Sequence, residues 1–226
     1  MENDYSIDQV MVRYNMEKAH HVLYSYDELK SINVDIDFIH QLLKLFEDER
    51  SFKADDFNKF SLEVIVDYIR KTHTYYLSKK LLEIEQSINL LLQDYADGHP
   101  LLQVLHSFYA RYKAHLTQHI AEEEHTLLPY ILQMEKAQMG VAIKALSIDG
   151  FSLQSFLDSH HDVEDDLQIA REAILQYNPP ATNETPYRIL LSQLQVFEKD
   201  LAVHTLIEDH VLVPRALSLE RQLNIN

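Results

Sequence analysis

Helix-breaking residues are scarce in this chain. Only three Gly and six Pro occur among 226 residues, so few positions favour a tight turn. Apolar residues recur at spacings of three and four over long stretches, whereas the alternation typical of half-buried strands is weak. The sequence therefore predicts an all-α protein built from long, nearly uninterrupted helices.

The periodic segments fall into two groups. Two short helices are predicted at residues 6–20 and 35–48, followed by a polar connector at Ser51–Asn58. Longer helices are predicted at residues 61–95, 101–138, 152–176 and 185–214. Short connections place successive helices antiparallel. We therefore expect an up-down-up-down four-helix bundle at residues 59–226, preceded by a small helical N-terminal domain at residues 1–58.

Proline marks several expected helix ends, because it lacks the backbone N–H that continues a helix. Pro129 is expected to kink the second long helix or to end its regular part, and Thr185-Pro186 opens the fourth. Pro214 is expected to end the fourth helix. The tail beyond it contains Leu217, Leu219 and Leu223, which are expected to pack either across a homodimer or against the bundle.

Charge and cysteine content exclude several classes of function. The formal net charge is −16, which repels nucleic acid and anionic lipid. The chain has no Cys, so disulfides, thiolate zinc sites and cysteine nucleophiles are excluded. The acidic N-terminus lacks the apolar core of a signal peptide, and no apolar run is long enough to span a membrane. A soluble, cytoplasmic protein is expected.

A repeated motif carries the candidate chemistry. The segments His119–Pro129 and His204–Pro214 both read His, then Glu four residues later, a second His, and a closing Pro. A helix with a central His precedes each copy. That residue is His73 before the first copy and His160 or His161 before the second. The bundle is therefore expected to consist of two related helix pairs, each of which offers two His and one Glu.

These residue types suit a metal centre. Residues four apart lie on one helix face, so His119 and Glu123 are expected to point together into the core, as are His204 and Glu208. Four imidazoles and two carboxylates then converge near a pseudo-twofold axis. A donor set without thiolate suits iron, manganese or zinc, and bridged metal pairs in bundle cores favour iron or manganese.

The repeat also selects among neighbouring residues. In the second copy only the position of Glu123 is acidic on the ligand face, so Glu122 and Glu124 are expected to be solvated charges. In the third long helix the apolar stripe centres near His160, whereas His161 lies on a polar face. We favour His160, with His161 as the alternative. The remaining histidines outside the N-terminal segment are expected to be ordinary polar residues: His40, His99, His106, His125 and His210. His115 and Tyr112 precede His119 on its helix face and are candidate pocket residues, although a plain buried polar contact is the favoured expectation for each.

The same segments resemble known motifs. They are similar to hemerythrin-like HHE cation-binding motifs, and the whole chain resembles the iron–sulfur cluster repair di-iron proteins, also called RIC proteins. The stretch Leu62–His73 resembles the opening of that family's first bundle helix. The resemblance implies two non-haem iron ions with a bridging oxo or hydroxo group. The implied ligands are His73, His119, Glu123, His160, His204 and Glu208.

The family resemblance also implies a function. It points to repair of iron–sulfur clusters damaged by nitric oxide or oxidants, with damaged iron–sulfur proteins as partners. The N-terminal segment departs from the family, because Ala19, His20 and His21 stand where the family has adjacent cysteines. Our hypothesis is that His20-His21 acts as a metal-transfer or gating element; two solvated histidines are the alternative.

Three functions compete on these grounds. The first is an iron store or donor for damaged iron–sulfur clusters. The second is a hemerythrin-like sensor that binds nitric oxide or dioxygen, or an enzyme that reduces nitric oxide. The third is a metal-free interaction module. Iron transfer to an acceptor favours the first, rapid turnover of nitric oxide the second, and absence of bound metal the third.

Overall fold

A computed structural model describes residues 10–14, 35–94, 100–140, 152–159, 171 and 184–223. Every regular element within these ranges is helical, and none is a strand. The predicted all-α class is confirmed. The chain divides into two compact units, the first comprising Met1–Tyr75, Glu123–His160 and Val203–Asn226, and the second comprising Tyr76–Glu122 and His161–Ala202.

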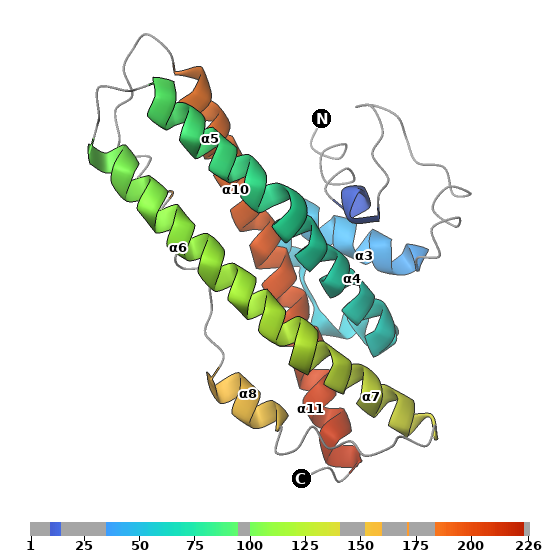
Figure 1. Cartoon of the computed structure of the whole chain (residues 1–226). Coiled ribbons are helices and arrows are strands. Elements are labelled where there is room, and N and C mark those ends of the chain that lie inside the picture. Colours follow the sequence, from blue (N-terminus) through green and yellow to red (C-terminus); the bar gives the residue numbers. More distant parts are fainter. Residues whose placement is uncertain are drawn as a thin grey trace. The chain divides into compact units, whose positions relative to one another are not determined.

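The first unit holds α4 (Leu62–Tyr75), which packs against α7 (Leu128–Gln138), while α11 (Val213–Gln222) packs against α7 as well (Figure 1). Two π-helical turns also belong to this unit, η5 (Glu123–Leu127) and η6 (Glu208–Leu212), the latter in contact with α4. Its shorter elements are η1 (Val12–Tyr14), α3 (Ile36–Glu47), η2 (Glu49–Ser51), η3 (Ala54–Phe57) and α8 (Leu153–Ser159).

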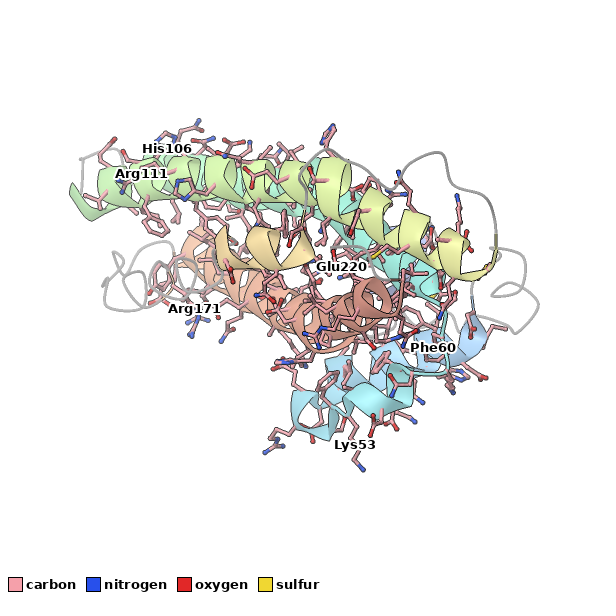
Figure 2. The ribbon with its side chains drawn as sticks, turned by 90° about the horizontal axis from the view of Figure 1, so that it is seen from below. Lys53, Phe60, His106, Arg111, Arg171 and Glu220 are labelled. Carbon is pink, nitrogen blue, oxygen red and sulfur yellow. The ribbon has the colours of Figure 1, made fainter. Side chains whose placement is uncertain are left out.

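Glutamates from neighbouring helices cap the starts of α4 and α8. The Glu135 carboxylate accepts hydrogen bonds from the backbone N–H groups of Leu62 at 2.7 Å and Glu63 at 2.8 Å. Glu220, labelled in Figure 2, accepts one from the Leu153 N–H at 3.3 Å. The first N–H groups of a helix have no partner within it, and a carboxylate there also suits the helix dipole. The two glutamates occupy equivalent positions after His119 and His204, so the repeat includes this capping role.

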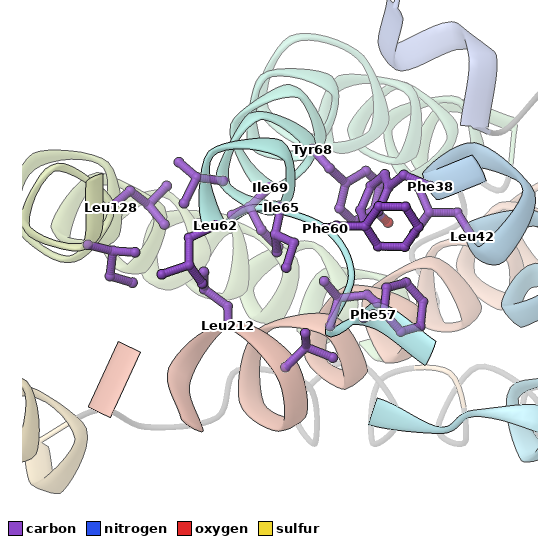
Figure 3. Close-up of a cluster of buried hydrophobic side chains, with 14 of the residues drawn as sticks. Phe38, Leu42, Phe57, Phe60, Leu62, Ile65, Tyr68, Ile69, Leu128 and Leu212 are labelled. Carbon is purple, nitrogen blue, oxygen red and sulfur yellow. The ribbon is translucent and has the colours of Figure 1, made fainter. Parts of the chain in front are cut away.

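Aromatic and aliphatic side chains fill the core of the first unit (Figure 3). Phe38 meets Phe60 edge to face with ring centroids 5.1 Å apart, and meets Phe57 in the same way at 6.0 Å. Burying one such side chain stabilises a fold by about 1.5–3 kcal/mol. Phe57 lies in the segment that was predicted to be a polar connector, so that prediction overlooked a core residue. The two short 3₁₀ turns η2 and η3 bring the Phe57 ring, which is 1% exposed, into the core.

The N-terminal segment shares this core. Val10 and Met11 are fully buried within the same cluster as residues of α3, α4, α7 and α11. The predicted helix at residues 35–48 is confirmed by α3. Most of the predicted helix at residues 6–20 falls outside the described residues. The division into domains at residues 58 and 59 stays a prediction.

The second unit holds the π-helical turn η4 (Tyr76–Lys80), α5 (Leu81–Asp94), α6 (Pro100–Glu122) and most of α10 (Thr185–Ile207). The Tyr109 hydroxyl donates to the Leu81 carbonyl at 2.7 Å, which ties α6 to α5. The buried Tyr76 hydroxyl donates to Asp200 at 2.8 Å and ties η4 to α10. Both contacts satisfy polar groups that would otherwise cost free energy when buried.

Three of the four predicted long helices are described along most of their length, and each contains a π-helical turn that the sequence did not predict. The second long helix continues through Pro129 to Gln138, and the fourth starts at Thr185 as expected. The prediction that Pro214 ends the fourth helix is wrong, because helix α11 runs on to Gln222. The third long helix is described only at α8 and Arg171, so the bundle topology stays a prediction.

The C-terminal leucines pack inside the first unit. Leu219 is buried, and Leu217 and Leu223 lie partly buried against the same hydrophobic cluster. Of the two expectations for this tail, packing against the helices is the one observed. In the part of the chain that the structure describes, no helix is both long and apolar enough to cross a membrane.

Candidate metal centre

Four of the predicted ligands lie together in the first unit. His73 is in the last turn of α4, and His204 is in the last turn of α10. Glu123 and Glu208 are the first residues of the π-helical turns η5 and η6. All four side chains are buried; His73, His204, Glu123 and Glu208 have 2%, 6%, 0% and 4% of their residue surface exposed, respectively. Ionisable groups are rarely buried to this degree unless they are paired or bind a metal.

Their ligand atoms converge. One ligand atom each from His73, Glu123 and His204 lies within 4.8 Å of the others. The His73 Nε2 atom is 3.1 Å from Glu123 Oε2, and His204 Nε2 is 3.0 Å from Glu208 Oε2. The two imidazole rings are 5.1 Å apart, centroid to centroid. Two helix ends and two π-helical turns therefore direct nitrogen and oxygen donors to one small region.

One buried atom tests whether these residues fit a metal ion. His73 Nε2 is inaccessible to solvent and makes no hydrogen bond within the described residues, although it lies 3.1 Å from Glu123 Oε2. Such a separation without hydrogen-bond geometry is what two ligands of a common ion would show. A bound cation would satisfy this nitrogen in the neutral ring, whereas in the metal-free site a protonated His73 can pair it with Glu123. The histidine and glutamate donors, without thiolate, suit iron, manganese or zinc.

The electrostatics of the metal-free site favour a cation. Burial raises the pKa of the Glu208 carboxyl, and the neighbouring Glu123 carboxylate raises it further. Burial lowers the pKa of His73, but its contacts with Glu123 and Glu124 raise it more, so that the pKa becomes about 9. Protons therefore offset the buried negative charge when no metal is bound. A divalent ion would take over that role and displace them.

Glu124 has a role that the sequence pattern did not predict. Its carboxylate lies 2.8 Å from His73 Nδ1 and 3.2 Å from Arg70 Nε. The prediction that Glu124 is a solvated charge is therefore wrong, whereas Glu122 is exposed as expected. A signal was present in the sequence, because Asp209 stands at the equivalent position of the second motif copy and the acid is repeated.

The π-helical turns explain how the helices pass the ligands and the prolines. Each of η5 and η6 starts at a glutamate that is a candidate ligand, and the helix that follows carries Pro129 or Pro214 in its first turn. The Val213 N–H bonds to the Glu208 carbonyl, five residues back. This wider turn makes room for a proline that would clash with the preceding turn of an α-helix. The helix therefore continues past the proline, and the glutamate stays in the core.

Of the two other predicted ligands, His119 and His160, the structure describes only His119. His119 lies half-buried on α6 in the second unit, and its role as a ligand stays a prediction. His160, its alternative His161, and the His20-His21 pair lie outside the described residues. His115 and four of the histidines that we expected to be ordinary polar residues are exposed: His40, His106, His125 and His210.

Comparison with known proteins identifies relatives of one kind. No protein-family model matches the chain. It is 22% identical over 150 residues to the iron–sulfur cluster repair protein ScdA of Staphylococcus haemolyticus, a match covering 66% of this chain and 64% of that protein, just under two thirds. It is 19% identical over 180 residues to ScdA of Staphylococcus epidermidis, covering 80% and 78%.

A third relative comes from another bacterium. The chain is 28% identical over 193 residues to the iron–sulfur cluster repair protein YtfE of Pectobacterium carotovorum, which covers 83% of this chain and 79% of the relative. Each match includes far more of the chain than the two histidine motifs. The resemblance predicted from those motifs is therefore confirmed: across most of its length, this chain is similar to proteins named iron–sulfur cluster repair proteins.

Proposed function

We propose that this protein is a non-haem di-iron protein that helps to repair iron–sulfur clusters damaged by nitrosative or oxidative stress. It would act by donating iron or by handling nitric oxide. The observation that carries the proposal is the buried convergence of His73, Glu123 and His204, with Glu208 beside them. The names of the relatives supply the repair role.

The proposed ligand set extends the observed cluster. His119 and His160 would complete it, giving four imidazoles and two carboxylates for two iron ions. Each glutamate would offer carboxylate oxygens beside the imidazole nitrogens, and such donor sets in the cores of helical bundles suit iron or manganese. When bound, the iron pair supplies labile metal together with a redox-active site for nitric oxide or dioxygen.

The chain's own residues would hold the iron and protect it. The side chains of His73, Glu123, His204 and Glu208 are all buried, which limits water access and strengthens the electrostatic attraction of the carboxylates. Burial raises the pKa of Glu208, and any proton that it holds would be released as the metal enters, because a ligand carboxylate must be ionised. The expected partners are damaged iron–sulfur proteins in the cytoplasm, with nitric oxide or dioxygen as small ligands.

The experiment measures iron transfer with matched variants. The protein is loaded anaerobically with Fe²⁺ and mixed with an iron-depleted cluster protein, and cluster recovery is followed by absorbance. We expect recovery with the wild type, none with His204→Ala/Glu208→Ala, and full recovery with His106→Ala, which removes an exposed histidine. Recovery that is equal in all three samples would contradict the proposal.

Nitric oxide provides the second arm of this experiment. If the loaded protein transfers no iron but consumes nitric oxide over many turnovers, the repair proposal fails in its iron-donor form. The hemerythrin-like sensor or nitric oxide-reducing enzyme then becomes the better description. If the wild type binds no iron at all, both forms fail, and the buried cluster is a structural feature of the helices.

A further inference from the structure

Two consecutive carboxylates contact the two nitrogens of the His73 imidazole ring, one at each nitrogen. Glu123 Oε2 lies 3.1 Å from Nε2, and Glu124 Oε1 lies 2.8 Å from Nδ1. We propose that Glu124, braced by Arg70, is a positioning residue that fixes the ring orientation and tautomer of His73 so that Nε2 is presented to the metal. This inference rests on the proposed metal-binding function and assigns a role to residues outside the ligand set.

The position of the proton on His73 decides which nitrogen can bind a metal. A histidine that binds a metal through Nε2 must carry its remaining proton on Nδ1, and the partner of that N–H sets the tautomer. Only Nδ1 faces Glu124, at a distance typical of a charge-assisted hydrogen bond. The contact therefore selects the tautomer that leaves the Nε2 lone pair available, and it raises the basicity of the ring toward a cation.

Arg70 forms an ion pair with Glu124. The other carboxylate oxygen of Glu124 lies 3.2 Å from Arg70 Nε, and Arg70 precedes His73 by one turn on α4. The Glu124 side chain is 27% exposed and that of Arg70 is 39% exposed. The pair thus lies at the edge of the core, where removing a carboxylate leaves little empty volume. The main effect of such a removal is expected on the orientation of His73 rather than on packing.

Two consecutive residues at the start of a π-helical turn reach one ring. Successive residues of an α-helix point about 100° apart, yet Glu123 and Glu124 both reach His73, from its two opposite nitrogens. They are the first two residues of η5. The second copy of the motif has Glu208 and Asp209 at the first two positions of η6. The acidic pair at the start of the π-helical turn is therefore a repeated feature.

The test measures Fe²⁺ affinity under anaerobic conditions, by competition with a colorimetric Fe²⁺ chelator. We expect Glu124→Ala to weaken binding by about 10–100-fold, the usual effect of losing such an outer partner. Glu122→Ala is the matched control, because it removes an exposed carboxylate two residues earlier, and it should change the affinity less than about twofold. Equal affinities for the two variants would overturn the inference.

A double-mutant cycle separates positioning from a general structural effect. If Glu124 acts through His73, then Glu124→Ala should cause no further loss of Fe²⁺ affinity in a His73→Ala background. A full additional loss there would overturn the inference. Arg70→Ala tests the same role while leaving Glu124 itself unchanged, in case the Glu124 variant misfolds. This substitution should weaken Fe²⁺ binding several-fold, and an unchanged affinity would contradict the role of Arg70. Absence of Fe²⁺ binding by the wild type would instead contradict the proposed function.

Discussion

The imidazole rings of His73 and His204 face each other in the core of the first unit, 5.1 Å apart and inclined by 59°. They come from α4 and α10, which are far apart in the sequence. Two buried histidines beside two buried carboxylates either pair with one another or bind a metal ion. We propose that they bind a metal ion, and this proposal has measurable consequences for stability, pH dependence and metal content.

Metal should stabilise the folded protein through His73. A ligand that binds only the native state raises the free energy of unfolding by about 2.7 kcal/mol when it is present at 100 times its Kd. We therefore expect Fe²⁺, added anaerobically, to raise the Tm of the wild type but to leave that of His73→Ala nearly unchanged. Differential scanning calorimetry measures this shift, and His106→Ala should retain it in full.

Without metal, the same site should make stability depend on pH. The pKa of His73 rises from 6.5 to about 9 in the folded protein, so folding favours its protonated form. This contribution is fully present below pH 6.5 and is lost as the pH rises through about 9. The raised pKa of Glu208 acts in the same direction, because its neutral form is favoured by burial.

We therefore expect the free energy of unfolding of the metal-free protein, measured in urea, to fall between about pH 6.5 and 9, the window set by the two pKa values of His73. The decline should be shallower in His73→Ala. Fe²⁺ or Zn²⁺ affinity should change in the opposite sense and increase with pH, because the metal competes with protons for the same atoms. A flat stability profile in the metal-free wild type would contradict this description of the site.

The carboxylate of Glu135 should contribute strongly to folding. It accepts hydrogen bonds from the first two N–H groups of α4, and hydrogen bonds to a charged group stabilise by about 1.5–3 kcal/mol. Glu135→Ala should lower the free energy of unfolding by about that amount. Glu63→Ala, which removes an exposed carboxylate in the same helix turn, should cost less than about 0.5 kcal/mol. Urea titrations of both variants provide the comparison.

Arg13 should anchor the N-terminal segment to α4. Its guanidinium is buried, lies 4.9 Å from the centroid of the Tyr75 ring, and donates to the Thr72 hydroxyl at 3.0 Å. Lys59 also lies 4.9 Å from a ring, that of Phe60, but it is exposed. A desolvated cation–π contact contributes about 2 kcal/mol or more, an exposed one about 0.5–1 kcal/mol. Arg13→Ala should therefore lower the free energy of unfolding, measured in urea, clearly more than Lys59→Ala does. Equal decreases in the two variants would contradict the anchoring role of Arg13.

Hydrophobic periodicity was sufficient to predict the long helices and the all-α class. The π-helical turns were not predictable in this way, because one inserted residue hardly changes a 3.6-residue pattern. Pro129 and Pro214 signalled only an interruption, and in the structure a wider turn followed by more helix accommodates each of them. Phe57 stands among charged residues, and its burial depends on contacts with distant parts of the chain.

The candidate site was predictable only where it repeats. The matching His and Glu positions in two copies predicted His73, Glu123, His204 and Glu208 as neighbours, and they lie together. The role of Glu124 depends on its distance from His73, which no pattern within one helix encodes. Helical spacing favoured acids three and four residues after His119, and the acid shared by Glu124 and Asp209 lies one position further along.

The most direct test is metal content. Protein purified from iron-supplied cells would be analysed by inductively coupled plasma mass spectrometry beside His204→Ala/Glu208→Ala, with His106→Ala as a control. We expect about two irons per chain in the wild type and the control, and a sharp loss in the double variant. Little metal in the wild type, or iron that is unaffected by the double substitution, would contradict the di-iron site.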